Sequence, residues 1–530
     1  MGNDATNSGV LVAAAAKSIQ SYVLAGHRVK DMVGASNLIE NLSGQLLRQS
    51  LAALDVAEAN VEIVTASAGG VRMLFRRPDD AAAFCECWPL LVAEFAPGLE
   101  ISMASVAVPG DPTGQIAGWQ EAERRLLENR CFAGFALPPA TPLLNRSPAG
   151  RPAVAVRDGE LQDALAARCR RFDQTDALVA RIFPGVAGDR FPRDITLLAG
   201  RRYVAVVHVD ADAMGKLLQS LLQLLADKRR ADWMKRLGDF SKNIDRAADA
   251  AVAEATRKHL IDGSAPESAV RLRPIVVAGD DVTVVLPAEN AADWVESFAT
   301  EFEKRANAAV REFWAETTGG DASAPTVSVS AGIAFVKPAF PFWRAYELAE
   351  SLTRTVKRTK DLDAAACGKS GLAFHRVTTS GLREPGTEFA TATAGAHQRI
   401  LTCCPYRVDD ADAEGATTAN LRALMKAVDA LPRGPLRELL GELYRGADEF
   451  NQRHERMAAV IKERGGEQWK NLLAALARIT IPKEDGKQFW CIKWDPVSRA
   501  EIWRTPLRDA LELLTVSARA TAGGAGEEAG

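Results

Sequence analysis

The chain has 530 residues, of which 47% are hydrophobic and 25% are charged, and its formal net charge is −3 at pH 7. This composition is typical of a globular protein with two to four domains, and it excludes a fibrous or wholly disordered chain. The small net charge excludes a global attraction to nucleic acid or to membranes, so such contacts would need local basic patches or partner subunits. The eight cysteines include no Cys-x-x-Cys pair, which favours a reducing cytoplasm. No apolar run is long enough to predict a membrane span.

The first 112 residues predict strands and helices in the order β-α-β-β-α-β. A strand at 11–16 enters a helical stretch that continues to about residue 54, and the remaining elements are strands at 60–67 and 71–77, a helix at 78–95 and a strand at 99–109. Gly69 and Gly70 supply the turn between the two central strands. This order predicts a ferredoxin-like domain.

Residues 113–195 are rich in proline, arginine and alanine, and they predict a connector with some helix at 160–172. The first pattern then returns in a second ferredoxin-like domain at 196–380. Its expected elements are a strand at 201–210, helical signals to about residue 259, a hairpin at 275–287, a helix at 291–314, a strand at 326–336 and a helix at 343–361. The helical signals exceed what one packing helix needs, so we infer a helical insertion near 218–270.

Residues 381–518 predict a helical C-terminal domain, and 519–530 a disordered tail. The expected fold class is therefore α+β, with two ferredoxin-like domains, a helical connector and a helical C-terminal domain.

Acidic residues stand at two points of the second domain. Asp210 ends the strand 201–210 with Asp212 two residues on, while Asp280 and Asp281 occupy the tip of the hairpin RLRPIVVAGDDVTVVLP. In a ferredoxin-like sheet the first strand lies antiparallel beside the central hairpin, so we expect the four carboxylates to converge. Converging carboxylates cannot all stay ionised unaided, and their oxygens suit Mg²⁺ or Mn²⁺. The pattern predicts a two-metal centre for nucleotidyl transfer.

A simpler interpretation is that the acidic turn is only solvated, as hairpin turns often are. The corresponding hairpin of the first domain reads SAGGVR, without an acid, so the fold plan does not itself require aspartates there. Lys357 could reach a triphosphate or lie on a solvated helix face, and Gly215 with Lys216 would let phosphates approach a helix N-terminus.

The motifs DADAMGKL, AGDDVTVVLP and VSVSAGIAFVKP, followed by ELAESLTRTVKR, resemble the second palm domain of the large GGDD-type subunit of type III CRISPR effector complexes. Residues 19–39 resemble the start of the first palm of that family, and the resemblance spans 10–110 and 200–380. It implies two palm-like, nucleotide-cyclase-like domains with ATP bound at their interface.

The resemblance implies that the 3′-hydroxyl of one ATP attacks the α-phosphate of another, which yields cyclic oligoadenylate messengers when the complex binds target RNA. It implies a location in the cytoplasm of a prokaryote, without membrane contact. The implied partners are crRNA, target RNA and the small repeat-type subunits of a ribonucleoprotein. The implied roles are metal binding for Asp210, Asp280 and Asp281 with help from Asp212, and nucleotide binding for Gly215, Lys216, Gly279, Ser330, Lys357 and Ser36.

Three departures from the family pattern have consequences. Ala278 replaces a glycine, which leaves nucleotide choice and product length open. No His-Asp dipeptide is present, so a built-in nuclease domain is not expected, and Cys131 with Cys169 are too few for a structural zinc. Two alternatives stay open: a stand-alone messenger synthase of a defence operon, and a non-catalytic scaffold that binds RNA and subunits.

Overall fold

A computed structural model gives the fold of the chain. It describes residues 9–517, apart from 27, 68, 132–136, 158, 173–175, 200–202, 262–268, 321–323, 363–367, 379–390, 395–396, 409–412, 433, 439–454, 457–458, 461–465, 481–490 and 496–499. The expected tail at 519–530 lies outside these residues, as do residues 439–454 of the segment expected to be helical. The described residues have a mixed α+β fold with several sheets.

The chain folds into two compact units, and each unit is built from three separate segments of the sequence. Unit 1 comprises Met1–Ile195, Ala213–Val284 and Thr300–Val327. Unit 2 comprises Thr196–Asp212, Val285–Ala299 and Ser328–Gly530.

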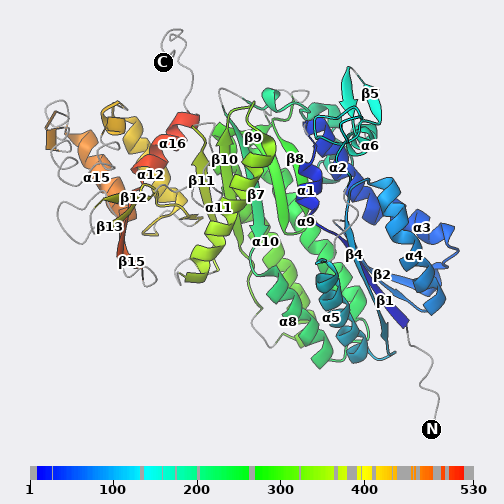
Figure 1. The fold of residues 1–530 in the computed structure, drawn as a ribbon. Helices are drawn as coiled ribbons and strands as arrows, with labels where there is room; N and C mark the ends of the chain where they lie inside the picture. The colour runs from blue at the N-terminus through cyan, green and yellow to red at the C-terminus, as the bar shows by residue number, and fades with distance from the viewer. Residues whose placement is uncertain are drawn as a thin grey trace. The chain divides into compact units, whose positions relative to one another are not determined.

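The first sheet, in unit 1, has the strand order β2-β3-β1-β4 with antiparallel neighbours (Figure 1). This is the order that a split βαβ unit produces, so the predicted succession of strands and helices is confirmed here. The apolar run of β1 is buried because helices pack on the sheet. The elements are β1 (Gly9–Ala16), α1 (Ile19–Leu24), α2 (Val29–Asn41), α3 (Leu47–Ala53), β2 (Val61–Ser67), β3 (Gly70–Phe75), α4 (Pro78–Phe95) and β4 (Ile101–Val108).

The segment expected to be a connector begins with a long helix that the sequence analysis did not predict. α5 (Pro112–Asn129) packs on β4 and β1, where its buried Trp119 and Leu126 extend the core of the first sheet. The helix expected at 160–172 begins only at residue 164, because 160–162 pair with 155–157 as a small hairpin. The remaining elements are β5 (Ala155–Arg157), β6 (Glu160–Gln162), α6 (Ala164–Phe172) and α7 (Ala177–Ile182).

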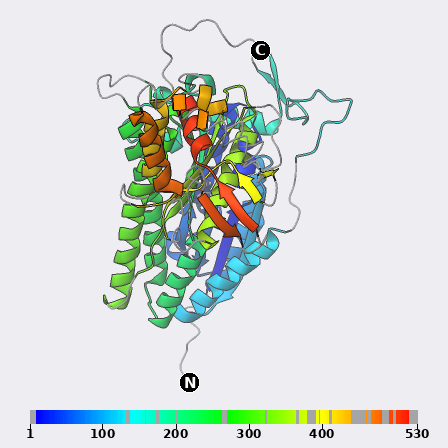
Figure 2. The same cartoon turned by 90° about the vertical axis from the view of Figure 1, so that its left-hand side faces the viewer.

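Three long helices account for the helical insertion and the helix after the hairpin: α8 (Met214–Asp227), α9 (Trp233–Leu260) and α10 (Ala291–Thr318). Figures 1 and 2 show them running alongside one another. Phe240 of α9 meets Phe313 of α10 with ring centroids 5.5 Å apart. None of the helices in the described part of the chain combines the length and apolar character that a membrane crossing requires.

The second sheet has the strand order β14-β11-β10-β7-β9-β8. β10 is buried along its whole length and β7 at every residue except Asp210, which explains their nearly continuous apolar sequences. β10 pairs antiparallel with β7 and parallel with β11; β11 and β14 were not predicted. The elements are β7 (Val204–Ala211), β8 (Arg273–Ala278), β9 (Asp281–Pro287), β10 (Val329–Val336), α11 (Phe342–Leu362), β11 (Gly371–Arg376) and β14 (Tyr406–Arg407).

The C-terminal segment, expected to be a helical domain, contains strands as well as helices. Helices α12 (Thr418–Asp429), α15 (Glu467–Thr480) and α16 (Leu507–Ser517) lie within this segment, and a four-stranded sheet accompanies them. Its order is β12-β13-β16-β15, and β13 pairs with a strand about a hundred residues away, so no local pattern signals it. The strands are β12 (Thr391–Ala394), β13 (His397–Ile400), β15 (Cys491–Asp495) and β16 (Ala500–Arg504).

Candidate active site

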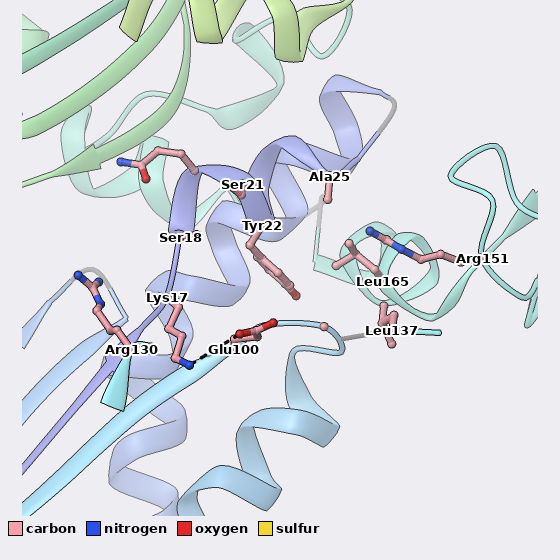
Figure 3. Close-up of a pocket in the computed structure, with 12 residues that line it drawn as sticks. Lys17, Ser18, Ser21, Tyr22, Ala25, Glu100, Arg130, Leu137, Arg151 and Leu165 are labelled. Carbon is pink, nitrogen blue, oxygen red and sulfur yellow. Dashed lines mark ion pairs between the residues drawn. The ribbon is translucent and has the colours of Figure 1, made fainter. Parts of the chain in front are cut away.

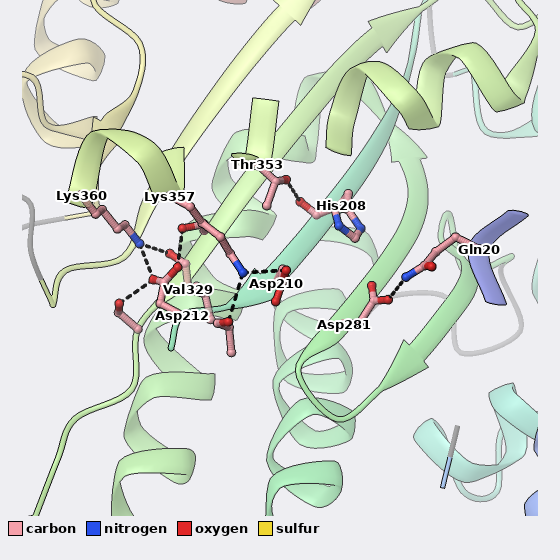
Figure 4. Close-up of polar contacts among 12 residues, drawn as sticks. Gln20, His208, Asp210, Asp212, Asp281, Val329, Thr353, Lys357 and Lys360 are labelled. Carbon is pink, nitrogen blue, oxygen red and sulfur yellow. Dashed lines mark hydrogen bonds and ion pairs between the residues drawn. The ribbon is translucent and has the colours of Figure 1, made fainter. Parts of the chain in front are cut away.

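Asp210 lies near the end of β7, in unit 2, and pairs with a lysine from α11. The Nζ atom of Lys357 is 2.6 Å from Asp210 Oδ2 and also donates to the backbone oxygen of Ala211 at 3.3 Å (Figure 4). Burial raises the pKa of Asp210, and the Lys357 ammonium opposes that rise. About a third of each side chain is exposed, 35% for Asp210 and 32% for Lys357, so solvent and solutes can reach this pair.

Asp212 follows β7 and is held by three donors. Ser328 Oγ donates to Oδ2 and Ser330 Oγ to Oδ1, both at 2.6 Å. Lys360 Nζ lies 2.6 Å from Oδ2 and also donates to the backbone oxygen of Val329 at 2.8 Å (Figure 4). Sequence reasoning missed Lys360 and Ser328; the spacing of three between Lys357 and Lys360 on one helix face was the available signal.

The tip of the β8–β9 hairpin, in unit 1, carries Gly279, Asp280 and Asp281. Gly279 has φ of +63°, and a Cβ there would lie 3.2 Å from the Oδ1 of Asp245, so both conformation and space favour glycine. The side-chain amide of Gln20, from α1, donates a hydrogen bond to Asp281 Oδ2 (Figure 4). Sequence analysis did not single out Gln20.

Arg181 of α7 holds the same hairpin from unit 1. It donates to the backbone oxygen of Val277 at 2.5 Å, to both carboxylate oxygens of Glu40 at 2.8 and 2.9 Å, and lies 3.1 Å from Asp249. Burial raises the pKa of Asp249 to about 6, against the opposing effect of Arg181. Burial likewise raises the pKa of Asp245. The acidic hairpin tip therefore rests on neighbours that are themselves ionisable and paired.

The other predicted residues lie on helices of unit 1. Gly215 and Lys216 are exposed in the first turn of α8, where backbone N–H groups lack helical partners. Ser36 is half-buried on α2. Among the described residues no group of three or more His, Cys, Asp or Glu side chains is gathered as a metal site. The carboxylate donors nonetheless suit a hard divalent ion, since Asp210 already draws a cation in Lys357.

Unit 1 also contains a cavity of about 670 Å³ beside α1 (Figure 3). Lys17, Arg130 and Arg151 line it, together with Glu100, which pairs with Lys17 at 3.8 Å. Tyr22 also lines the cavity. Only 6% of this residue is exposed, and its hydroxyl has no hydrogen-bond partner among the described residues. The cavity thus has an excess of positive charge, and sequence analysis did not predict it.

A known family model matches a segment of the second ferredoxin-like domain. Residues 203–366 match the family model described as Cas10/Cmr2, second palm domain. The matched segment contains all the predicted site residues except Ser36. A comparison with curated proteins gives no match.

Solved structures give a wider likeness. A crystal structure of a Csm1-Csm4 cassette in complex with cA4 is similar over 96% of this chain and 70% of that chain, with a TM-score of 0.51 and 13% identity. A Csm1-Csm4 cassette in complex with one ATP matches over 68% of this chain and 55% of that chain, with a TM-score of 0.42 and 14% identity. Csm1 of T. onnurineus matches over 69% and 53%, again with a TM-score of 0.42 and 14% identity.

This chain thus spans 55% of the solved chain with one ATP, about half its length. At 13% identity the cA4 complex supports the fold alone. Together the findings identify residues 203–366 as similar to the second palm domain of Cas10/Cmr2, within a chain whose fold is Csm1-like.

Proposed function

We propose that this chain is the large subunit of a type III CRISPR effector complex and converts ATP to cyclic oligoadenylates when the complex binds target RNA. In the proposed reaction the 3′-hydroxyl oxygen of one ATP forms a bond to the α-phosphorus of another. The bond between the α-phosphorus and the oxygen that bridges it to the β-phosphate breaks, the hydroxyl releases its proton to water, and pyrophosphate leaves with the bridging oxygen. Repetition and ring closure give the cyclic product.

The observation that carries the proposal is the position of the acidic residues within the matched palm segment. Asp210 is near the end of β7 and Asp281 begins β9, and these two strands are neighbours in the sheet order. We propose that Asp210, Asp280 and Asp281 hold Mg²⁺ or Mn²⁺. Such ions, when bound, lower the pKa of the attacking hydroxyl and stabilise the leaving pyrophosphate.

Lys357 has a defined part in this proposal. Its ammonium neutralises Asp210 at 2.6 Å, and a divalent ion at Asp210 would take over that charge. Lys357 would then be free to contact the phosphates, as its partly exposed, flexible stem allows. The exposed first turn of α8, with Gly215 and Lys216, offers backbone N–H groups to the same phosphates.

The second ATP is proposed to lie against the first palm-like domain. The basic cavity beside α1, with Lys17, Arg130 and Arg151, supports a phosphate-bearing ligand there. Partners are proposed by analogy: a similar protein was crystallised with Csm4 as a subcomplex of a type III-A CRISPR-Csm interference complex. We therefore propose that this chain associates with a comparable subunit, with crRNA and with target RNA.

The test is product formation from ATP and Mg²⁺ by the purified complex, with and without target RNA. We expect oligoadenylates and pyrophosphate, and a loss of at least about a hundredfold for D280A/D281A, because the metal centre supplies several kcal/mol of the barrier reduction. D79A/D80A is the matched control, since it removes another adjacent acidic pair, in the first turn of α4. Full activity of D280A/D281A would disprove the metal assignment, and absence of product under every condition would favour the scaffold.

A further inference from the structure

Two lysines of α11 pair with two aspartates at the end of β7, and the two pairs differ in burial. Lys357 and Asp210 are 32% and 35% exposed, whereas Lys360 and Asp212 are 9% and 18% exposed. The chemistry and the 2.6 Å distance are the same in both pairs. One ion pair is therefore open to exchange with solutes, and the other is enclosed by protein.

The carboxylate of Asp212 has little capacity left for a metal. Its Oδ2 already accepts from Ser328 and Lys360, and its Oδ1 accepts from Ser330. The Lys360 stem is enclosed as well, because its Cε lies 3.6 Å from the place of a Cβ on Gly371. A metal on Asp212 would have to displace these donors and would leave a buried ammonium without its counter-ion, which is strongly unfavourable.

The first sheet provides an internal comparison for this position. Lys17 is the residue after β1, and Asp212 is the residue after β7. The backbone N–H of Lys17 donates to the backbone oxygen of Glu100 at 2.7 Å, and the backbone N–H of Asp212 donates to the backbone oxygen of Ser328 at 2.8 Å. The preceding residues are in equivalent register, with Ala15 opposite Ser102 and Asp210 opposite Ser330.

In the first sheet this position again forms an ion pair, but with the signs reversed. Lys17 is the cation and Glu100 is the anion. The hairpin of that sheet has no acidic motif, so an ion pair at this position does not depend on metal chemistry. In both sheets the ion pair joins the residue after the first strand to a neighbouring segment, which is the residue before β4 in the first sheet and α11 in the second.

We propose that Asp212 and Lys360 are positioning residues, not metal or phosphate ligands, and that they fix the end of β7 against α11 so that Asp210 and Lys357 face the reacting groups. This inference rests on the proposed function. Lys360 acts through the backbone, since it also holds the Val329 oxygen at 2.8 Å, next to Ser330. Of the two lysines, only Lys357 exchanges its partner during the reaction.

The first experiment measures metal binding without activity. Mn²⁺ alone is titrated into the full chain and into D210N, D212N and K360M, followed by electron paramagnetic resonance. We expect D210N to weaken Mn²⁺ binding by about tenfold or more, and D212N and K360M to leave it within about threefold. An equal loss in D212N and D210N would overturn the inference. Absence of Mn²⁺ binding by the wild-type chain would overturn both the inference and the proposed function.

The second experiment measures product formation by the complex at varied Mg²⁺ and ATP. D212N and K360M should lower kcat by about tenfold or more with an unchanged Mg²⁺ requirement, and D212N/K360M should lose no more than the worse single variant, because the two residues act as one unit. Multiplying losses in the double variant, or a raised Mg²⁺ requirement, would contradict the positioning role.

S330A keeps both charges and tests the same network if D212N does not fold. A positioning role predicts a lower kcat at unchanged KM for ATP, whereas direct nucleotide binding by Ser330 predicts a raised KM and would count against it. If the wild-type complex makes no product while Mn²⁺ binding still separates D210N from D212N, the proposed function fails and the assignment of Asp212 outside the metal set stands.

Discussion

A buried aspartate far from the candidate site in sequence shows how strongly one residue can depend on distant partners. Asp509 of α16 is only 2% exposed, and its Oδ2 accepts hydrogen bonds from the Tyr406 hydroxyl at 2.6 Å and from the Cys403 amide at 2.8 Å. Burial raises the pKa of Asp509 from 3.8 to about 7. The folded chain therefore holds a proton on Asp509 that the unfolded chain releases above about pH 4.

This linkage predicts a pH dependence that can be removed by one substitution. Because the folded pKa is the higher one, Asp509 contributes most to stability below pH 3.8, and the contribution is lost as the pH rises to about 7. D509N should remove this fall in stability, which is on the order of 1 kcal/mol per pH unit between pH 5 and 7 in the wild-type chain. Melting temperatures of both proteins across this range measure it, with D239N on the exposed face of α9 as the control. Parallel pH profiles for wild type and D509N would rule out the linkage.

The sequence carries the signal for the ionisable site residues but not for the groups that surround them. Asp210, Asp280 and Asp281 stand out because acids interrupt apolar strands. The partners Gln20, Arg181 and Lys360 come from elements up to about 260 residues away and look like ordinary surface residues. Their role depends on tertiary packing, which local patterns do not contain.

At the scale of elements, the glycine of the Ser330-Ala331-Gly332 stretch sets the distance between β10 and α11. A Cβ on Gly332 would lie 2.0 Å from the backbone oxygen of Ala349 and 2.8 Å from the amide of Thr353. The helix that carries both lysines therefore approaches the strand as closely as the backbones allow.

G332A should push α11 away from β10. We expect a stability loss of about 1–3 kcal/mol from overpacking, together with lower product formation, because Lys357 and Lys360 move with the helix. Thermal melting and the oligoadenylate assay measure the two effects. G44A is the control, since a Cβ there meets no atom within 4 Å. If G332A melts and reacts like G44A, α11 is not held by this contact.

Periodicity predicted most strands and helices of the two repeated units, because buried strands and amphipathic helices leave long patterns. Short strands were missed for a physical reason. β14 has two residues and owes its existence to hydrogen bonds with Leu372 and Gly371 of β11. α5 was missed because residues 113–195 were assigned as a whole to a connector rich in proline, arginine and alanine, whereas the carboxylate of Asp111 accepts from the amide of Gly114 and caps the helix.

At the scale of the whole molecule, the helical insertion finds its partners in the first part of the chain. Trp233 of α9 is fully buried, meets Trp119 of α5 edge-on with ring centroids 5.7 Å apart, and donates its indole N–H to Gln115 at 3.0 Å. Gly238 of α9 lies so close to β2 that a Cβ would be 2.5 Å from the Val64 oxygen. Excess helical signal predicted the insertion, but nothing local indicated this pairing.

Unit 1 should consequently unfold as one body although three chain segments build it. W233A removes a fully buried aromatic ring and leaves Gln115 without its donor, so we expect a loss of about 3–5 kcal/mol. Hydrogen exchange should accelerate in α5 and β4 as well as in α9, because the Trp119 contact joins them. W343A, which truncates a tryptophan that is 46% exposed, should leave exchange in all three elements near the wild-type rates. Acceleration confined to α9 in W233A would mean that the insertion folds independently of the first sheet.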